Sequence, residues 1–304
     1  MSRKIKLILN PITNHGRSRQ IAANLHLLMT EQNADWSSTD YPNHATELAR
    51  QAGEQGYDVV VAVGGDGTVH EVINGLMQVP QEQRPALGIV PLGSGNDFAH
   101  TLGIPKDPAQ ALQSVINGQP RSLDVGSVRD QDGRQEYFNN TIGIGFDAVV
   151  TIRSRKITLI HGFMMYFVAV VQTIILNFKS MDLHVETDQE SWDQSTLMLT
   201  LGNGPREGGG FLVTPAAKFD DGLLNYATIR KVSRPMMFRL IPEVMKGTHG
   251  RFKPVRMGVC HKMAVASQQP LYVHLDGEIY AGFGTDVRKL SIEILPNSIR
   301  FLKE

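Results

Sequence analysis

Five consecutive apolar residues, Val59–Val63, lead directly into the turn 64–68, and a helical pattern follows. A run that is apolar at every position predicts a parallel strand covered by helices on both faces. Glycines at the end of such a strand let a backbone approach a phosphate, and the next helix adds N–H donors. Asp66 repels an anion here unless Mg²⁺ accompanies the phosphates. The turn alone indicates either a nucleotide site with Mg²⁺ or an ordinary strand–turn–helix connection.

The first 120 residues alternate between short strand patterns and helical patterns. This order predicts a doubly wound α/β domain with a parallel sheet. We expect strands at residues 4–10, 35–41, 57–64 and 86–93, and helices at residues 15–34, 44–56, 69–78 and 107–119.

The second half contains short alternating runs that predict antiparallel strands and a β-sandwich-like domain. We expect strands at residues 122–128, 136–145, 181–187, 195–203, 222–229, 262–267, 270–278 and 290–295, interrupted by two helices at residues 157–178 and 233–247. The expected domains are residues 1–123 and 124–295, and the segment 296–304 is expected to complete the first.

Composition excludes several classes of protein. Lys plus Arg equals Asp plus Glu at 30 each, so no general affinity for nucleic acid is expected. The single cysteine, Cys260, is expected to be a buried apolar residue. Because one cysteine cannot form an internal disulfide, a location in the reducing cytoplasm is favoured. The N-terminal apolar run is too short for a signal peptide and reads as a strand. A homodimer is compatible with the sequence but cannot be derived from it.

The segment Ile157–Phe178 is strongly apolar and about as long as a bilayer span. His161, Gly162, Gln172 and Asn177 interrupt it, so we predict a buried or surface-docked helix rather than a transmembrane one. A helix that lies on the membrane surface or lines an acyl-chain groove is the alternative to plain core packing.

A second glycine turn strengthens the nucleotide hypothesis. Gly93, Ser94, Gly95, Asn96 and Asp97 again follow an apolar strand and precede a helix. Two such turns after parallel strands are expected to face one crevice. Neither turn has the spacing of a Walker A loop or of a dinucleotide fingerprint. The polar loop from Asn10 to Gly16 is expected at the edge of the same site.

The second half carries two acidic Asp-Gly turns, at Asp220-Asp221-Gly222 and at Asp276-Gly277-Glu278. From spacing alone, an ordinary hairpin connection is the favoured explanation of each turn, ahead of a functional acidic site. The glycines of the stretch 202–211 suit a loop that lies against a ligand or a neighbouring strand.

These stretches together resemble the diacylglycerol kinase catalytic family, and specifically its bacterial soluble lipid kinases. The matching motifs are GGDGTVHEV, PLGSGNDFA, GNGPREGGGF, FDDGLLNY and LDGE, in the order of the family. The first loop also occurs in NAD kinases, but the combination does not. The resemblance implies two domains with the active site in the cleft between them, and transfer of phosphate from ATP to a lipid hydroxyl.

The resemblance also implies roles for particular residues. Asp66 would organise the catalytic Mg²⁺ through water, and Glu278 or the neighbouring Asp276 would be the general base, although Asp276 could instead hold metal. A structural Mg²⁺ would be held by Asp221 and by the carbonyls of Lys218 and Leu223, in a register that Asp220 leaves uncertain by one residue. The ATP-binding residues would be Gly64, Gly65, Asp66, Gly67, Thr68, Val69, His70, Glu71, Ser94, Gly95, Asn96 and Asp97, with Thr39 as the weakest match.

We therefore expect a cytoplasmic enzyme that visits the membrane surface and phosphorylates diacylglycerol to phosphatidic acid. Monoacylglycerol, phosphatidylglycerol, a sphingoid base or undecaprenol are alternative acceptors. The other hypotheses are a kinase of a soluble acceptor such as NAD, and a non-catalytic lipid carrier. Retention of Asp66, Asp97, Asp276 and Glu278 argues against the carrier.

Overall fold

The computed structural model describes residues 3–13, 18–30, 32–157, 159–160 and 162–304. The chain forms two compact units, Met1–Asp124 with Pro296–Glu304, and Val125–Leu295. Parts of the expected loop at Asn10–Gly16, of the first expected helix and of the apolar segment, including His161, lie outside the described residues.

The first unit contains a parallel sheet in the order β2-β1-β3-β4. Each strand is in register with its neighbour and runs in the same direction, and Phe301 near the end of the chain pairs in parallel with Leu87 of β4. All residues of β3 and β4 are buried, as the apolar runs predict. The strands are β1 (Ile5–Leu9), β2 (Ala34–Ser38), β3 (Val59–Gly64) and β4 (Ala86–Pro91).

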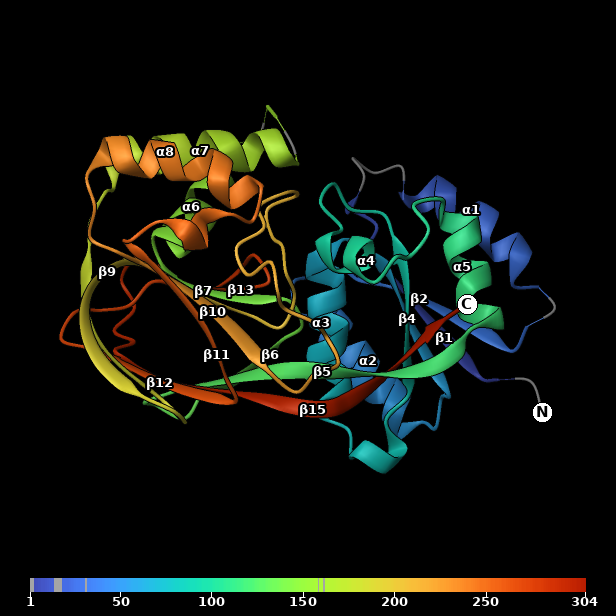
Figure 1. Cartoon of the computed structure of the whole chain (residues 1–304). Coiled ribbons are helices and arrows are strands. Elements are labelled where there is room, and N and C mark those ends of the chain that lie inside the picture. The colour runs from blue at the N-terminus through green and yellow to red at the C-terminus, as the bar shows by residue number, and fades with distance from the viewer. Residues whose placement is uncertain (1–2, 14–17, 31, 158, 161) are drawn as a thin grey trace. The chain divides into compact units, whose positions relative to one another are not determined.

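Helices cover both faces of this sheet. α1 contacts α5 and α2 contacts α3, and Figure 1 shows the two pairs on opposite sides of the strands. This is the doubly wound α/β arrangement that the alternation predicts. The helices are α1 (Ser18–Leu28), α2 (His44–Glu54), α3 (Asp66–Leu76), α4 (Asp97–Thr101), α5 (Pro108–Asn117) and the 3-10 turn η2 (Gln81–Gln83).

The second unit is built from antiparallel strands around one apolar core. Its main order is β14-β13-β7-β9-β8-β12-β15, β10 pairs with β9 and β11, and β5 pairs with β6. Residues of most of these strands share one buried cluster, which gives the sandwich-like packing. The strands are β5 (Gln119–Asp130), β6 (Gln135–Phe138), β7 (Thr141–Gly145), β8 (Met181–Thr187), β9 (Ser191–Gly202), β10 (Leu224–Arg230), β11 (Val255–Cys260), β12 (Lys262–Ser267), β13 (Val273–Leu275), β14 (Glu278–Ala281) and β15 (Lys289–Lys303).

The helices of the second unit pack over a second apolar cluster. They are α6 (Phe146–Ser154), α7 (Phe163–Leu176), α8 (Arg234–Met245) and the 3-10 turn η3 (His249–Arg251). Figure 1 shows α7 and α8 side by side, and the two helices are in contact. Within the described residues, no helix combines the length and the apolar character that a membrane span requires.

Four details of the second unit differ from the sequence prediction. A third helix, α6, follows β7, in a stretch for which the sequence pattern predicts no element. The strand β11 was not predicted. The expected strand 136–145 is divided into β6 and β7, and the stretch 270–278 ends in a turn that leads to β14. Both divisions occur where Asp276 interrupts the strand ladder, as described below.

The hydrogen bond between Asp188 and His261 in this unit is expected to make its stability depend on pH in the acid range. The turn after β8 places the Asp188 carboxylate 2.8 Å from Nδ1 of His261. This hydrogen bond, as the largest contribution, and the backbone N–H groups of His261 and Lys262 lower the pKa of Asp188 from 3.8 to about 2. Because the folded pKa lies below the unfolded value, the stabilisation is complete above about pH 4 and is lost as the pH falls toward 2. We expect the variant His261→Gln to return the pKa of Asp188 toward 3.8, as measured by carboxyl NMR titration. An unchanged pKa in that variant would contradict the assignment.

Candidate functional site

The carboxyl edge of the parallel sheet gathers four polar segments of the first unit. Asn10 follows β1, Thr39 follows β2, and the two glycine turns follow β3 and β4. The backbone N–H of Asn10 donates to the Val63 carbonyl at 3.0 Å, and its side-chain amide donates to Thr68 Oγ1 at 3.2 Å. Hydrogen bonds therefore join the segment after β1 to the end of β3 and the start of α3, at the edge where α/β sheets bind ligands.

The two glycine turns lie directly against each other. A Cβ built on Gly93 would stand 2.5 Å from the Cα of Gly65, so a side chain at position 93 cannot be accommodated. Asp66 joins the turns further, since its Oδ1 accepts the N–H of Phe98 at 3.3 Å. The first turn of α3 thus opens beside the second loop, with the Asp66 carboxylate at their junction.

The residues at this junction are suited to hold Mg²⁺. A Cβ built on Gly95 would lie 3.1 Å from Asp66 Oδ2 and 3.9 Å from Asp97 Oδ2, so both carboxylates lie beside Gly95. Carboxylate oxygens are the donors that this hard cation prefers. Glycine at position 95 therefore brings no side chain against these two carboxylates.

Several of the expected ATP contacts have other roles in the structure. Both carboxylate oxygens of Glu71 accept backbone N–H groups at the start of α2, from Asn43 at 3.0 Å and Ala45 at 3.1 Å. Val69 and His70 are buried. The Asn96 side chain closes its own loop through the N–H and carbonyl of Gly93. Among the expected side chains, Asp66 and the exposed Ser94 are better placed to face a ligand than these four are.

In the second unit, Asp276 and Gly277 form the turn of a hairpin between β13 and β14. Both residues have positive φ, at 52° and 84°, as a tight hairpin turn requires. The Asp276 carboxylate accepts the N–H groups of Asn139, Asn140 and Thr141 at 2.9, 2.8 and 3.0 Å. These bonds occupy the carboxylate and connect the hairpin to the start of β7.

Glu278 follows this turn as the first residue of β14 and is partly exposed. Arg155, just after α6, forms an ion pair with its carboxylate and also donates to the Gly277 carbonyl at 3.1 Å. The Glu278 side chain is 42% exposed and pairs with Arg155, whereas three backbone N–H groups donate to the Asp276 carboxylate.

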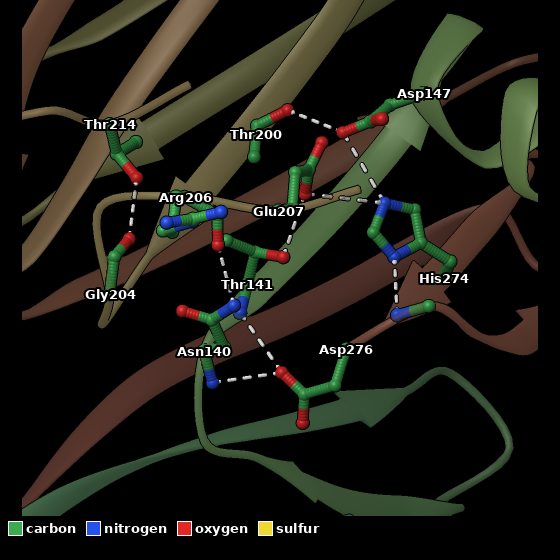
Figure 2. A network of polar contacts seen from close by, with 11 residues as sticks. Asn140, Thr141, Asp147, Thr200, Gly204, Arg206, Glu207, Thr214, His274 and Asp276 are labelled. Atoms are coloured by element: carbon green, nitrogen blue, oxygen red, sulfur yellow. Dashed lines mark hydrogen bonds and ion pairs between the residues drawn. The ribbon is translucent and has the colours of Figure 1, made fainter. Parts of the chain in front are cut away.

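A buried polar cluster, formed by Asp147, Glu207 and His274, was not predicted from the sequence (Figure 2). Nε2 of His274 lies 3.3 Å from Asp147 Oδ2 and 3.8 Å from Glu207 Oε2. Two hydroxyl groups complete it: Thr200 donates to Asp147 at 2.9 Å, and Thr141 donates to Glu207 at 2.8 Å. Burial alone raises the pKa of Asp147, but the nearby His274 and the hydrogen bonds from neighbouring side chains outweigh it, so the pKa is lowered.

Weak sequence signals for this cluster exist. His274 lies two residues before the Asp-Gly turn, and Glu207 lies within the glycine-rich stretch 202–211. Asp147 follows β7 at the start of α6. Nothing in the local pattern of any one segment connects it to the other two.

The turn that contains Lys218, Asp221 and Leu223 precedes β10. Asp221 Oδ1 accepts the N–H of Leu223 at 3.1 Å, which folds the carboxylate back over the turn. The hairpin explanation of this Asp-Gly pair is wrong, because residues 212–223 form turns and loop rather than a strand that pairs with β10. The hairpin explanation is confirmed at Asp276-Gly277.

Comparison with known proteins identifies the class. Residues 4–128 match the diacylglycerol kinase catalytic domain, and residues 140–303 match the YegS C-terminal NAD kinase beta sandwich-like domain. The chain belongs to the diacylglycerol kinase catalytic-domain family of lipid kinases.

Individual relatives agree with this assignment. A protein of Chromohalobacter salexigens named "Probable lipid kinase YegS-like" is 37% identical over 75% of this chain and 70% of its own length. A protein of Mycobacterium tuberculosis named "Diacylglycerol kinase" is 30% identical over 81% of this chain and 79% of its own. A solved structure described as a diacylglycerol kinase of Bacillus anthracis str. Sterne shares the fold, with a TM-score of 0.73 at 20% identity over all of this chain and 97% of its own.

Proposed function

We propose that the protein transfers the γ-phosphate of MgATP to the hydroxyl of diacylglycerol and forms phosphatidic acid. The observation that supports this most is the carboxyl edge of the first unit, where two glycine turns meet at Asp66. A transfer of this kind depends on positioning and on neutralising phosphate charge. Labelled ATP and diacylglycerol in detergent micelles test the proposal, with labelled phosphatidic acid as the expected product.

Each unit has its own task in the proposed reaction. The phosphates would be held by the first glycine turn, residues 64–68, which includes the first residues of α3, and by the second glycine turn, residues 93–97, which includes Ser94. Thr39 would be a further contact. Asp66 would hold Mg²⁺ through water beside Asp97. The bound ion would supply positive charge that neutralises the phosphate oxygens.

The hairpin of the second unit would serve the acceptor. A lipid alcohol is a poor nucleophile, so its attack on the γ-phosphate needs a general base. We assign this role to Glu278, which would take the proton of the lipid hydroxyl. Asp276 would hold the hairpin, through the N–H groups of Asn139, Asn140 and Thr141, rather than meet the substrate. Lys218, Asp221 and Leu223 would hold a second, structural Mg²⁺ before β10.

Access to a lipid requires a surface that meets the bilayer, and we propose that α7 and α8 provide it. In α7, the apolar side chains of Met164, Ile175 and Leu176 are 54, 55 and 64% exposed. α8 exposes Phe238 and Met245 beside it. Apolar side chains exposed together on two adjacent helices suit insertion among lipid headgroups.

Charge around these helices favours an anionic membrane. The stretch from Ala148 to Met181 contains Arg153, Arg155, Lys156 and Lys179 but no Asp or Glu, and of these four Arg155 is paired with Glu278. α8 adds Arg234 and Arg239, and its one acidic residue, Glu243, is paired with Arg251 at 2.7 Å. Because the whole chain has no net charge, this local excess is a specific feature.

The same helix also packs against the acceptor hairpin. Tyr166 of α7 brings its hydroxyl to 3.2 Å from the position of a Cβ on Gly277. Phe163 stacks on Phe211 at the end of the glycine-rich stretch, with ring centroids 5.4 Å apart. A lipid that enters beside α7 would therefore arrive near Glu278.

We expect the variant Phe238→Ser to bind vesicles that contain phosphatidylglycerol about tenfold more weakly, because the side chain would no longer enter the bilayer. Vesicles of phosphatidylcholine alone should bind the wild-type protein less well, and salt should reduce binding to the anionic vesicles. Cosedimentation measures each value.

The matched control is Phe283→Ser, which removes an exposed phenylalanine from the loop between β14 and β15. It should bind vesicles like the wild-type protein. Equal binding by Phe238→Ser and the wild-type protein would remove α8 from the proposed membrane surface.

A further inference from the structure

The buried cluster of Asp147, Glu207 and His274 has no task in the reaction described so far. His274 is 2% exposed and belongs to β13, directly before the Asp276-Gly277 turn. The three residues come from the ends of the neighbouring strands β13, β7 and β9, or from the segments that follow these strands. Through His274, the cluster is thus part of the hairpin that carries Glu278.

The hydrogen bonds of His274 define its tautomer. The N–H of Gly277 donates to Nδ1 at 3.2 Å, so this nitrogen is an acceptor and carries no proton. The ring is then neutral with its proton on Nε2, which lies 3.3 Å from Asp147 Oδ2 and 3.8 Å from Glu207 Oε2. Asp147 Oδ2 is the nearer of the two carboxylate oxygens to that proton.

This tautomer argues against a metal ion in the cluster. An imidazole that binds a metal through Nε2 carries its proton on Nδ1 and donates it to an acceptor. Here Nδ1 faces a backbone N–H, which is itself a donor. Two carboxylates and a histidine within reach of one another therefore do not make a metal site here.

The side chains of His274 and Asp147 pack directly against Gly143. A Cβ at that position would lie 2.2 Å from Nε2 of His274 and 2.4 Å from Asp147 Oδ2. Any side chain at position 143 would displace the imidazole from the carboxylates.

We propose that His274 is a positioning residue for phosphoryl transfer: Asp147 fixes its tautomer, and Nδ1 holds the N–H of Gly277 so that Glu278 faces the acceptor hydroxyl. The proposal rests on the proposed function, because it takes Glu278 as the base. Asp276 anchors one side of the turn on β7, and His274 anchors the other side.

Two variants of similar size separate the two nitrogens of His274. Asparagine places an acceptor near the position of Nδ1 and can still bind the Gly277 N–H, but it does not reach the carboxylates. Glutamine places a donor near Nε2 but offers nothing at Nδ1. We expect His274→Gln to lower kcat by about a hundredfold with an unchanged KM for ATP, as a misplaced catalytic group does, and His274→Asn to retain most of its turnover.

A third variant tests the role of Asp147. Asp147→Asn keeps the shape but can present an amide N–H to Nε2, which favours the tautomer with the proton on Nδ1. That proton opposes the N–H of Gly277, so kcat should fall as it does in His274→Gln.

Amide hydrogen exchange at Gly277, followed by NMR, reads out the positioning without any assay of activity. Exchange should be faster in His274→Gln than in the wild-type protein and near wild type in His274→Asn. Melting temperatures identify any variant that fails to fold. If the two His274 variants lose kcat equally, or if neither changes Gly277 exchange, the proposal is wrong.

Two other outcomes are also decisive. One equivalent of Zn²⁺ or Mn²⁺ bound by the wild-type protein and lost in both His274 variants would replace the positioning role with a metal site. If the wild-type protein phosphorylates no lipid, the proposed function fails, and Gly277 exchange alone then decides whether His274 holds the turn.

Discussion

Replacing Asp66 with asparagine is expected to lower lipid phosphorylation by at least about a thousandfold, because charge neutralisation at the phosphates supplies most of the catalysis in such transfers. Asp66 begins α3 at the junction of the two glycine turns, and its carboxylate lies beside Gly95. Asparagine keeps the shape and can still accept the Phe98 N–H, so the fold should persist. Initial rates at saturating MgATP and lipid measure the loss.

The control for this variant is Asp107→Asn in the same unit. Asp107 caps α5 by accepting the N–H of Gln110 at 2.9 Å, and asparagine is an equally good cap. Its turnover should equal that of the wild-type protein. Substantial activity in a folded Asp66→Asn protein would count against any role of Asp66 in holding Mg²⁺.

Glu278→Gln is expected to lower kcat by about 10²- to 10⁴-fold, the usual contribution of a general base. Glutamine cannot accept a proton, whereas its size and its contact with Arg155 are nearly those of glutamate. Binding of ATP should be unchanged, because the nucleotide is assigned to the first unit. Rapid-quench kinetics and equilibrium binding of a labelled nucleotide separate the two effects.

Glu136→Gln provides a matched control, because Glu136 also pairs with an arginine in the second unit, Arg134, at 2.7 Å. It should leave kcat unaltered. Normal turnover by Glu278→Gln would show that another group accepts the proton. Asp276 is a poor replacement, since three backbone N–H groups occupy its carboxylate.

Much of the first unit could be predicted because its signals are local. The apolar run of β3 and the glycines that follow it define a buried parallel strand and its turn within ten residues. The parallel order of the strands then brings both turns to one edge. The close approach of Gly65 and Gly93 is a tertiary detail that the pattern alone does not contain.

The second unit was less predictable because its determinants are distant in sequence. The division between β6 and β7 depends on Asp276, which is more than 130 residues away along the chain. Asp147, Glu207 and His274 belong to three separate segments that only the strand order β13-β7-β9 brings together. The Asp-Gly pair at Asp221 looks the same locally as the one at Asp276, but only the second has strands on both sides that pair with each other.

The measurement that tests the central claim most directly is transfer of labelled γ-phosphate from MgATP to a mixed lipid extract in detergent micelles, with NAD in a parallel tube. The account predicts a labelled product in the organic phase that migrates with phosphatidic acid. A different labelled lipid would keep the kinase and change the acceptor to phosphatidylglycerol or a sphingoid base. Label found only in NADP, or in no product at all, would contradict the proposed lipid phosphorylation.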